Sequence, residues 1–339
     1  YLMQQWNRAK GGPRAATVMT IHNLAFQGQY SASLLPYIGL PPEVYSVEQM
    51  EYFGDISYLK GGLVTADHIT VVSPTYAREI LSPTFGMGLD GVLNARMDRL
   101  QGIVNGIDNE VWNPATDPYL PFRYDMKTLR NKKNNKALLL ERFNLEPGDG
   151  PLFSAVTRIT WQKGMDVLVS VLDHLVGIGG RLALLGSGDA EIEQAFQAAA
   201  ARHPGRIGVK LGYDEGLSHR LQGGGDAILI PSRFEPCGLT QLYGLAYGCV
   251  PVVSRTGGLA DTVIDANPAA LAAGVATGIQ MNAVSHNALA MAVSRVVELY
   301  AQPPEWKRLQ KNGMKADFSW GASGAAYAAL YRQLLEEQG

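Results

Sequence analysis

Short apolar runs recur at regular intervals between residues 152 and 281, and this pattern constrains the fold more than any other feature of the sequence. Stretches with helical spacing separate most of the runs, notably residues 165–176, 190–201 and 239–247. Repeated alternation of strand and helix specifies a doubly wound parallel sheet, so we predict a Rossmann-like α/β domain here. The predicted strands are residues 152–156, 182–185, 207–211, 227–230, 250–253 and 277–280.

The residues before this region show a mixed α/β pattern of their own. Predicted strands cover residues 17–21, 68–72 and 102–104, and predicted helices cover residues 42–47, 58–66, 74–81 and 89–99. Residues 105–124 contain Asn-Pro and Asp-Pro steps, which favour turns and predict a linker. Helical spacing appears in residues 126–143 and returns in residues 287–301, 305–313 and 319–335. A chain of 339 residues is long enough for the two domains that this pattern indicates.

Two loops follow predicted strands and carry the side chains best suited to bind a ligand. Arg158 and Lys163 lie after strand 152–156, and Glu235 lies after strand 227–230. Open α/β sheets bind ligands at the carboxyl edge, so both loops should contribute to one site. A guanidinium and an ammonium can neutralise a diphosphate, while a carboxylate beside the amides of a helix start suits a polyhydroxylated group. The chemistry indicated is transfer from a nucleotide sugar.

Both loops resemble those of retaining glycosyltransferases with the GT-B fold. The string at residues 235–244, Glu-Pro-Cys-Gly-Leu-Thr-Gln-Leu-Tyr-Gly, is similar to bacterial glycogen synthases and plant starch synthases in particular. Further similar strings occur in the same order at residues 22–28, 104–108, 255–263 and 317–320. On these residues the sequence is identified as a member of that family.

The resemblance implies a GT-B architecture of two Rossmann-like domains, the amino-terminal one incomplete in this chain. Residues 1–105 would form a partial acceptor-side domain, residues 106–318 the nucleotide-sugar domain, and residues 319–339 a helix that returns to the amino-terminal domain. The implied activity is transfer of glucose from ADP-glucose to the non-reducing end of an α-1,4-glucan such as glycogen, with retention of configuration. The family works without a metal, so no cofactor is expected.

The resemblance implies catalytic roles for four side chains. Arg158 and Lys163 would hold the donor phosphates and neutralise the departing diphosphate. Glu235 would engage the glucosyl hydroxyls, and His22 would contact the transferred sugar. The residues alone leave alternatives open, because loop cations are often ordinary surface charges, an acid at a helix start can serve the helix dipole, and a histidine after a strand is often structural.

The other predicted contacts are to the nucleotide, the phosphates and the sugar. Tyr213, which follows strand 207–211, would stack on adenine, with a simple rim aromatic as the alternative. Asn105 looks like a sugar contact, although an Asn-Gly step is also a turn signal. Amides and hydroxyls at two helix starts complete the set, at Cys237, Gly238, Leu239 and Thr240 and at Thr256, Gly257 and Gly258.

Composition excludes several classes of function. The 29 basic and 31 acidic residues nearly balance, so no overall field attracts nucleic acid or an anionic membrane. No apolar run approaches the roughly 18 residues of a membrane span, and the first residues lack a signal-peptide pattern. We therefore expect a cytoplasmic protein without nucleic-acid or membrane partners. Two cysteines and scattered histidines match neither a disulfide framework nor a metal site.

Some alternatives stay open at this point. The chain begins at Tyr1 without the lysine loop that family members carry near their start, so we expect a fragment. Lys60 lies in a similar string, but within predicted helix 58–66, and it is not assigned that loop's role. A truncated, weakly active or inactive nucleotide- or glucan-binding remnant is one alternative, and a UDP-glucose-dependent enzyme or a phosphorylase is another. The oligomeric state is open, with a homo-oligomer as one option.

Overall fold

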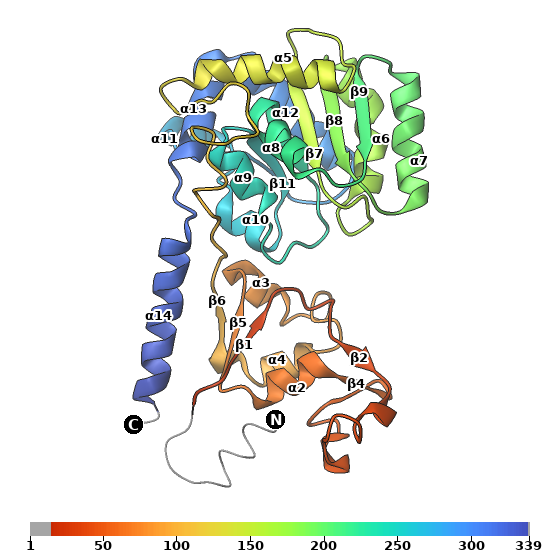
Figure 1. Cartoon of the computed structure of the whole chain (residues 1–339), viewed down its shortest axis with the longest axis vertical. Helices are drawn as coiled ribbons and strands as arrows, with labels where there is room; N and C mark the ends of the chain where they lie inside the picture. Colours follow the sequence, from red (N-terminus) through yellow and green to blue (C-terminus); the bar gives the residue numbers. More distant parts are fainter. Residues whose placement is uncertain (1–14, 338–339) are drawn as a thin grey trace. The chain divides into compact units, whose positions relative to one another are not determined.

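The computed structural model describes residues 15–337, which divide into two compact units (Figure 1). Of the described residues, the smaller unit contains residues 15–105 together with residues 321–337. The larger unit is Gly106–Trp320 and contains all the predicted site residues except His22 and Asn105.

The larger unit is built on a six-stranded parallel sheet with the strand order β12-β11-β10-β7-β8-β9, of which β7, β8, β9 and β11 are labelled in Figure 1. Its strands are β7 (Leu152–Val156), β8 (Arg181–Gly186), β9 (Ile207–Leu211), β10 (Ala227–Ile230), β11 (Val250–Ser254) and β12 (Ile279–Met281). The order reverses at β7, whose neighbours are β8 on one side and β10 on the other. The doubly wound parallel sheet predicted from the apolar runs is therefore confirmed.

Helices cover both faces of this sheet, because alternate side chains of each strand point to opposite faces. In β8, Leu182 and Leu184 join the core formed with α6, α7 and α12, whereas Ala183 and Leu185 join the core formed with α5 and α8. The helices are α5 (Lys132–Arg142), α6 (Met165–Gly177), α7 (Ala190–Arg202), α8 (Glu215–Gly224), α9 (Thr240–Ala246), α10 (Gly257–Thr262), α11 (Pro268–Ala273), α12 (His286–Tyr300) and α13 (Pro303–Lys315).

Helix α8 was not predicted from the sequence. Its glycines at positions 216, 223 and 224 weaken the helical pattern, since glycine is a poor helix former. The structure stabilises the helix in two other ways. The side chain of Asp214 accepts a hydrogen bond from the Leu217 amide at the first turn, and the helix packs against α5 through Leu217 and Leu221.

The smaller unit contains a three-stranded parallel sheet with the order β1-β5-β6 (Figure 1). Its strands are β1 (Val18–Ile21), β5 (His68–Val71) and β6 (Leu100–Gly102). Its helices are α2 (Tyr58–Thr65), α3 (Pro74–Glu79), α4 (Asp90–Asn94) and α14 (Trp320–Glu336), the last of which has its first residue in the larger unit. A small antiparallel sheet of β2 (Gln29–Tyr30), β4 (Asp55–Ser57) and β3 (Glu51–Tyr52) was not predicted.

Several predicted elements of the smaller unit were wrong in extent. The helix predicted at residues 42–47 is a short 3₁₀ turn, Pro42–Val44. The helix predicted at residues 89–99 breaks after α4, because Arg96 turns back and donates to the carbonyls of Leu63 and Ala66 at the end of α2. A second 3₁₀ turn, Met97–Arg99, follows the break, so the last strand begins at Leu100 rather than at residue 102.

Lys60 lies inside α2, as the sequence predicted. Its side chain is buried, and the ammonium donates to the carbonyls of Val47 at 2.7 Å and Glu51 at 2.5 Å. Burial lowers the pKa of Lys60, although Glu51 and Glu48 oppose this effect. The ammonium thus serves the packing of the smaller unit.

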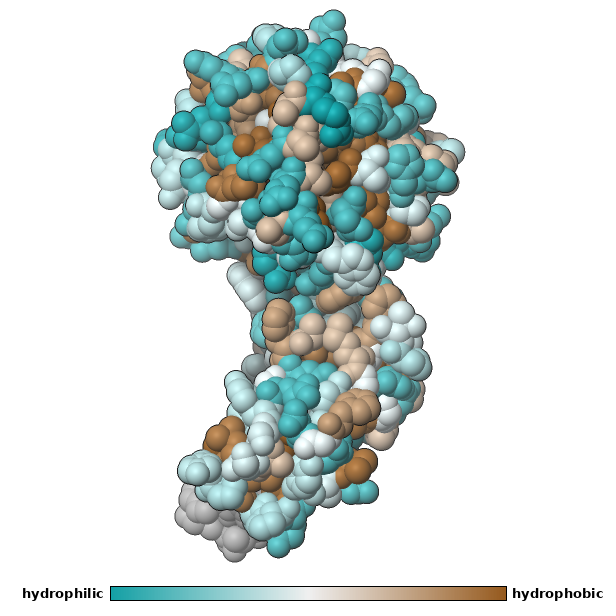
Figure 2. Space-filling view, turned by 90° about the vertical axis from the view of Figure 1, so that its right-hand side faces the viewer, coloured by the Kyte–Doolittle hydropathy of each residue, from teal (hydrophilic) through white to brown (hydrophobic). Residues whose placement is uncertain are grey.

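Figure 2 shows a face of the larger unit on which polar and apolar side chains are interspersed. Among the helices of residues 15–337, none has the length and apolar character that a membrane crossing requires.

Candidate active site

The two loops predicted to form the site are brought together because β7 and β10 are adjacent strands. The β7 loop (residues 157–164) carries Arg158 and Lys163, and the β10 loop (residues 231–239) carries Glu235. Lys163 Nζ lies 2.6 Å from Glu235 Oε2. The cation predicted to bind phosphate and the acid predicted to bind sugar therefore form an ion pair with each other.

Glycine at position 164 allows this close approach of the two loops. Gly164 has a φ of +66°, and a Cβ atom there would lie 2.0 Å from the Pro231 carbonyl oxygen. Any other residue would push the β7 loop away from the end of β10. Gly164 thus fixes the position of its neighbour, Lys163.

The Lys163–Glu235 pair is largely buried but not fully coordinated. The side chains of Lys163 and Glu235 are 16% and 10% exposed. Glu235 Oε2 also accepts a hydrogen bond from Ser232 Oγ at 2.9 Å. Within residues 15–337, Glu235 Oε1 and the remaining ammonium hydrogens of Lys163 have no further partner. The pair therefore has free hydrogen-bonding capacity for a ligand.

A cavity beside the pair, the Glu235 cavity, has a volume of about 70 Å³. Lys163, Ser232 and Glu235 line it together with Gly238 and Thr240. A larger cavity, the Tyr213 cavity, has a volume of about 330 Å³ and is lined by Arg158, Gly186 and Tyr213 among others. The two cavities adjoin, since Val156 and Thr157 line both. Together they run along the carboxyl edge of the sheet, where ligand binding was expected.

Arg158 and Tyr213 are both accessible at this edge. Arg158 is exposed, and its Nη2 donates to Gln162 Oε1 at 3.3 Å, a contact that a phosphate could replace. Tyr213 is 85% exposed, so its ring is free to stack on a flat group. The structure thus places the predicted phosphate and adenine contacts on one cavity.

The start of α9 is held by a glutamine whose binding role the sequence did not indicate. Gln241 is buried, and its Nε2 donates to the carbonyls of Cys237 at 3.1 Å and Gly238 at 2.9 Å. Gly238 has a φ of +72°, which favours glycine, and Thr240 is the first residue of α9. Leu239 and Thr240 line the Glu235 cavity, whereas Cys237 is buried. Ligand contacts by these residues stay predictions.

In the predicted nest at Gly257 and Gly258, one amide is engaged within the protein, and ligand contacts by the nest stay predictions. The amide of Gly258 donates to the carbonyls of Glu235 and Pro236, both at 3.2 Å, so it is already engaged within the protein. A Cβ at either glycine would lie within 2.1 Å of a carbonyl oxygen of the β10 loop. The two glycines, which follow Thr256 at the start of α10, therefore let α10 pack against the loop that carries Glu235.

His22 and Asn105 belong to the smaller unit. His22 is exposed directly after β1, and Asn105 is half-buried after β6. Their predicted contacts with the sugar stay predictions.

Arg233 is a site residue to which sequence reasoning assigned no role. Its guanidinium donates to both oxygens of Asp166, at 2.7 Å and 2.8 Å, and to the carbonyl of Trp161 at 2.6 Å. The hydrogen bond from Arg233 lowers the pKa of Asp166, against the effect of partial burial. The β10 loop is thereby tied to the β7 loop beside the Lys163–Glu235 pair. The sequence contained only a partial signal: Arg233 lies in the loop between predicted strand 227–230 and Glu235, but nothing pointed to Asp166 as its partner.

A second missed cluster lies where residues 108–124 pack on α8 and α9. Asp117 is fully buried and accepts hydrogen bonds from His219 at 2.8 Å and Tyr247 at 2.5 Å. The Trp112 ring stacks between His219 and Tyr243, with centroid distances of 3.8 Å and 3.6 Å. These contacts join residues 108–124 to α8 and α9, although the buried His219 Nε2 has no hydrogen-bond partner within residues 15–337.

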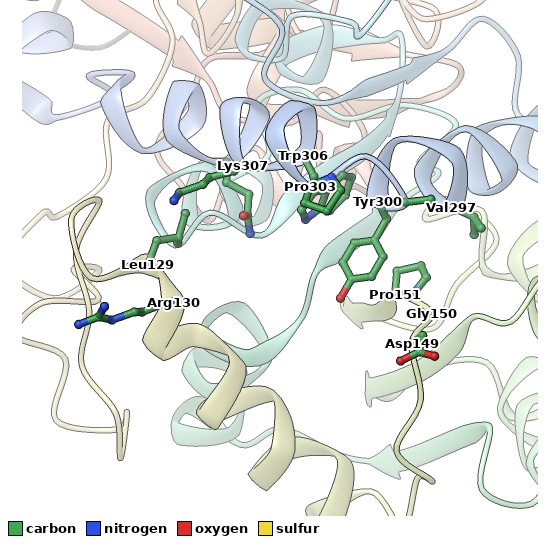
Figure 3. Close-up of a pocket in the computed structure, with 12 residues that line it drawn as sticks. Leu129, Arg130, Asp149, Gly150, Pro151, Val297, Tyr300, Pro303, Trp306 and Lys307 are labelled. Carbon is green, nitrogen blue, oxygen red and sulfur yellow. The ribbon is translucent and has the colours of Figure 1, made fainter.

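A third cavity, of about 640 Å³, lies at the opposite, amino edge of the sheet and is shown in Figure 3. It is lined by Asp149, Gly150 and Pro151 before β7, and by Tyr300 and Trp306 near the joint of α12 and α13 (Figure 3). None of the predicted site residues lines this amino-edge cavity. Within residues 15–337, no cluster of histidine, cysteine and acidic side chains is arranged to hold a metal ion.

Comparisons with known proteins match both units. A family model described as starch synthase catalytic domain matches residues 1–95, and a model described as glycosyl transferases group 1 matches residues 139–316. The glycogen synthase of Novosphingobium aromaticivorans is 62% identical over 327 residues, which cover 96% of this chain and 67% of that protein. Glycogen synthase 1 of Rhizobium meliloti is 57% identical over 323 residues, with coverages of 95% and 67%.

A solved structure is also similar to this chain. The catalytic domain of starch synthase IV from Arabidopsis thaliana, bound to ADP and acarbose, has a TM-score of 0.91 and 33% identity to this chain. The match covers 98% of this chain and 69% of that one. The sheet order, the cationic carboxyl edge and these matches define a glycosyltransferase of the GT-B class, as predicted from the sequence. Within that class, the chain belongs to the family of bacterial glycogen synthases and starch synthases.

Proposed function

We propose that this chain transfers glucose from ADP-glucose to the non-reducing end of an α-1,4-glucan, with retention of configuration. Relatives named glycogen synthases and a starch synthase structure bound to ADP and acarbose support this substrate pair. The observation that carries the proposal is the incompletely coordinated Lys163–Glu235 pair, which lies beside a cavity lined by Arg158 and Tyr213.

The donor would lie along the carboxyl edge of the sheet. Adenine stacks on Tyr213 in the Tyr213 cavity, and the diphosphate extends past Arg158 toward Lys163. A diphosphate beside Lys163 shares the ammonium with Glu235, so the carboxylate can accept hydrogen bonds from the glucosyl hydroxyls. His22 and Asn105 would contact the transferred sugar. This arrangement needs no metal, because side-chain cations neutralise the diphosphate.

The chemical step breaks the bond between C1 of glucose and the diphosphate oxygen. The bonding electrons leave with ADP, and Arg158 and Lys163 stabilise the charge that develops on it. The acceptor hydroxyl bonds to C1 on the face that the diphosphate leaves, and its proton passes to the departing phosphate oxygen. Exclusion of water from the site limits hydrolysis of the donor.

The proposal is tested by measuring ADP release from ADP-glucose in the presence of glycogen. Arg158→Ala should lower kcat/KM by about 10²- to 10³-fold, by analogy with the loss of other groups that stabilise a developing anion. Lys133→Ala, which removes an exposed cation on α5, is the matched control and should leave the rate unchanged. Equal rates for wild type and Arg158→Ala would contradict the proposed site.

The alternative functions predict different results. Faster release of UDP from UDP-glucose would reassign the donor. Binding of ADP in a calorimetric titration without any glucose transfer would favour a nucleotide-binding remnant. A cytoplasmic location is a separate proposal. The oligomeric state, for which a homo-oligomer is one option, can be measured by size-exclusion chromatography with light scattering.

A further inference from the structure

Arg233 connects the two loops of the site through its side chain, its backbone and its position over an aromatic ring. The guanidinium makes a two-pronged contact with Asp166 at the start of α6 and donates to the Trp161 carbonyl in the β7 loop. Its carbon Cζ lies 4.3 Å from the centroid of the Trp161 ring. The backbone amide of Arg233 also donates to the carbonyl of Gln162 at 2.9 Å. We call Arg233, Asp166 and Trp161 the Arg233 clasp.

The clasp differs from an ordinary surface ion pair of the same molecule. Arg202 and Asp173 make a single contact of 3.2 Å, and their side chains are 53% and 70% exposed. The side chains of Arg233 and Asp166 are only 21% and 38% exposed, and both guanidinium prongs are used. Paired hydrogen bonds and stacking on an indole fix a guanidinium in one orientation, whereas single exposed pairs contribute little.

The clasp residues lie close in sequence to Lys163 and Glu235 but do not line the ligand cavities. Lys163 lies between Trp161 and Asp166 in the sequence, and Glu235 follows Arg233 in the β10 loop. None of the three clasp residues lines the Glu235 cavity or the Tyr213 cavity. Arg233 is therefore placed to act on a ligand only through the loops that it joins.

Diphosphate binding would tend to separate the β7 loop from the β10 loop unless a contact holds them together. The phosphates and Glu235 are both anionic and would lie on either side of Lys163, so their repulsion pushes the β10 loop away from the β7 loop. Catalytic groups lose effectiveness when they are displaced by even a fraction of an ångström. A contact outside the cavities that joins the two loops opposes this displacement.

We propose that Arg233 and Asp166 are positioning residues that hold the β7 loop against the β10 loop, so that Lys163 stays between Glu235 and the donor diphosphate. The kinetic part of this inference rests on the proposed glucosyl transfer. The structural part of the inference, that the clasp restrains residues 157–164, is independent of the proposed glucosyl transfer.

The first test compares kinetic constants of full-chain variants. Arg233→Met and Asp166→Asn should each lower kcat/KM for ADP-glucose by about 10²-fold, because either change opens the clasp. Arg233→Lys should recover only part of the rate, since an ammonium cannot make the paired contact and the stacking together. The matched control, Arg202→Met, should stay within about twofold of wild type, as expected for an exposed pair. Wild-type kinetics in both folded clasp variants would overturn the proposal.

The second test separates positioning from general loss of stability. If the clasp acts through Lys163, adding Arg233→Met to Lys163→Ala should change kcat/KM by less than about twofold, because the two effects are not independent. If the two losses multiply, Arg233 acts in some other way and the proposal fails. Thermal unfolding of each variant identifies any that is not folded, and Asp166→Asn, which keeps the side-chain size, then replaces Arg233→Met in the cycle.

A third measurement needs no catalysis. Deuterium uptake by peptides covering residues 157–164 should be faster in Arg233→Met than in wild type, and unchanged in Arg202→Met. Equal uptake in wild type and Arg233→Met would overturn the clasp, whatever the activity of the chain. Failure of wild type to release ADP from ADP-glucose would instead count against the proposed function alone.

Discussion

Two lysine–carboxylate pairs lie at opposite edges of the same two neighbouring strands, β7 and β10. At the carboxyl edge, Lys163 and Glu235 are 2.6 Å apart, with side chains 16% and 10% exposed. At the amino edge, Lys136 and Asp226 are 2.7 Å apart, with side chains 14% and 10% exposed. In distance and burial the two pairs are nearly identical, yet their surroundings differ.

The amino-edge pair is satisfied by the protein itself. Lys136 also donates to the Gly150 carbonyl at 3.2 Å and to the Tyr300 hydroxyl at 3.0 Å, and Asp226 accepts from the Leu152 amide at 2.8 Å. The carboxyl-edge pair has Ser232 as its one further partner within residues 15–337, and it lines a cavity. The comparison indicates that spare hydrogen-bonding capacity, more than burial or pair distance, distinguishes a site for substrate from a structural contact.

The largest expected effect is a loss of folding stability when the amino-edge pair is disrupted. Asp226→Asn leaves the buried ammonium of Lys136 without its counter-charge and should reduce the free energy of unfolding by about 3–5 kcal/mol. Glu235→Gln should cost less than about 1 kcal/mol, because Lys163 can turn into the adjoining cavity and be solvated. Urea denaturation followed by circular dichroism measures both. Equal losses in the two variants would show that the pairs are equivalent.

The next effect is on activity, which should fall when the carboxyl-edge pair is changed and not when the amino-edge pair is changed. Lys163→Ala should lower kcat/KM for ADP-glucose by about 10²- to 10³-fold, which corresponds to about 3–4 kcal/mol of transition-state stabilisation. Lys136→Ala, measured below its unfolding temperature, should retain a rate close to wild type because Lys136 is at the far edge of the sheet. A comparable loss of kcat/KM in folded Lys136→Ala would contradict the assignment of separate roles.

The smallest effect is the pH dependence of the amino-edge pair. Burial lowers the pKa of Lys136, but Asp226 and the Tyr300 hydroxyl outweigh this, so the pKa is raised. A raised pKa means that the stabilisation is complete below the unfolded value of about 10.4 and is lost as the pH rises through the folded value. The stability advantage of wild type over Lys136→Met should therefore be constant between about pH 8 and pH 10 and shrink above that range. A difference that grows with pH would contradict this sign.

The sequence predicted the sheet of the larger unit well because its strands are buried on both faces. The run Ala227–Ile230 is continuously apolar, and Leu152–Val156 is apolar except for Ser154, so both are readily recognised as buried strands. The antiparallel strands Gln29–Tyr30 and Glu51–Tyr52 contain two residues each and carry no periodicity. The break after α4 depends on Arg96 reaching a different helix, which no local pattern encodes.

The sequence predicted the site residues that belong to individual loops, but not the contacts between loops. Arg158, Lys163, Glu235 and Tyr213 follow strands that the pattern identifies, so their common edge followed from the topology. The direct contact of Lys163 with Glu235 could not be predicted, because it depends on the close approach at Gly164. The contact of the Gly258 amide with the β10 loop could not be predicted for a related reason, since an amide at a helix start can bind a neighbouring loop as well as a ligand.

The adjacency of β7 and β10 also affects how the protein acquires its activity during folding. Helix α6 and two strand–helix pairs, β8 with α7 and β9 with α8, separate β7 from β10 along the chain, so β10 reaches its place beside β7 only after a long loop has closed. Helices form quickly from local contacts, whereas closing such a loop is slow. Recovery of catalysis on refolding should therefore lag behind recovery of helical signal, which makes turnover a reporter of the long-range pairing of β7 with β10.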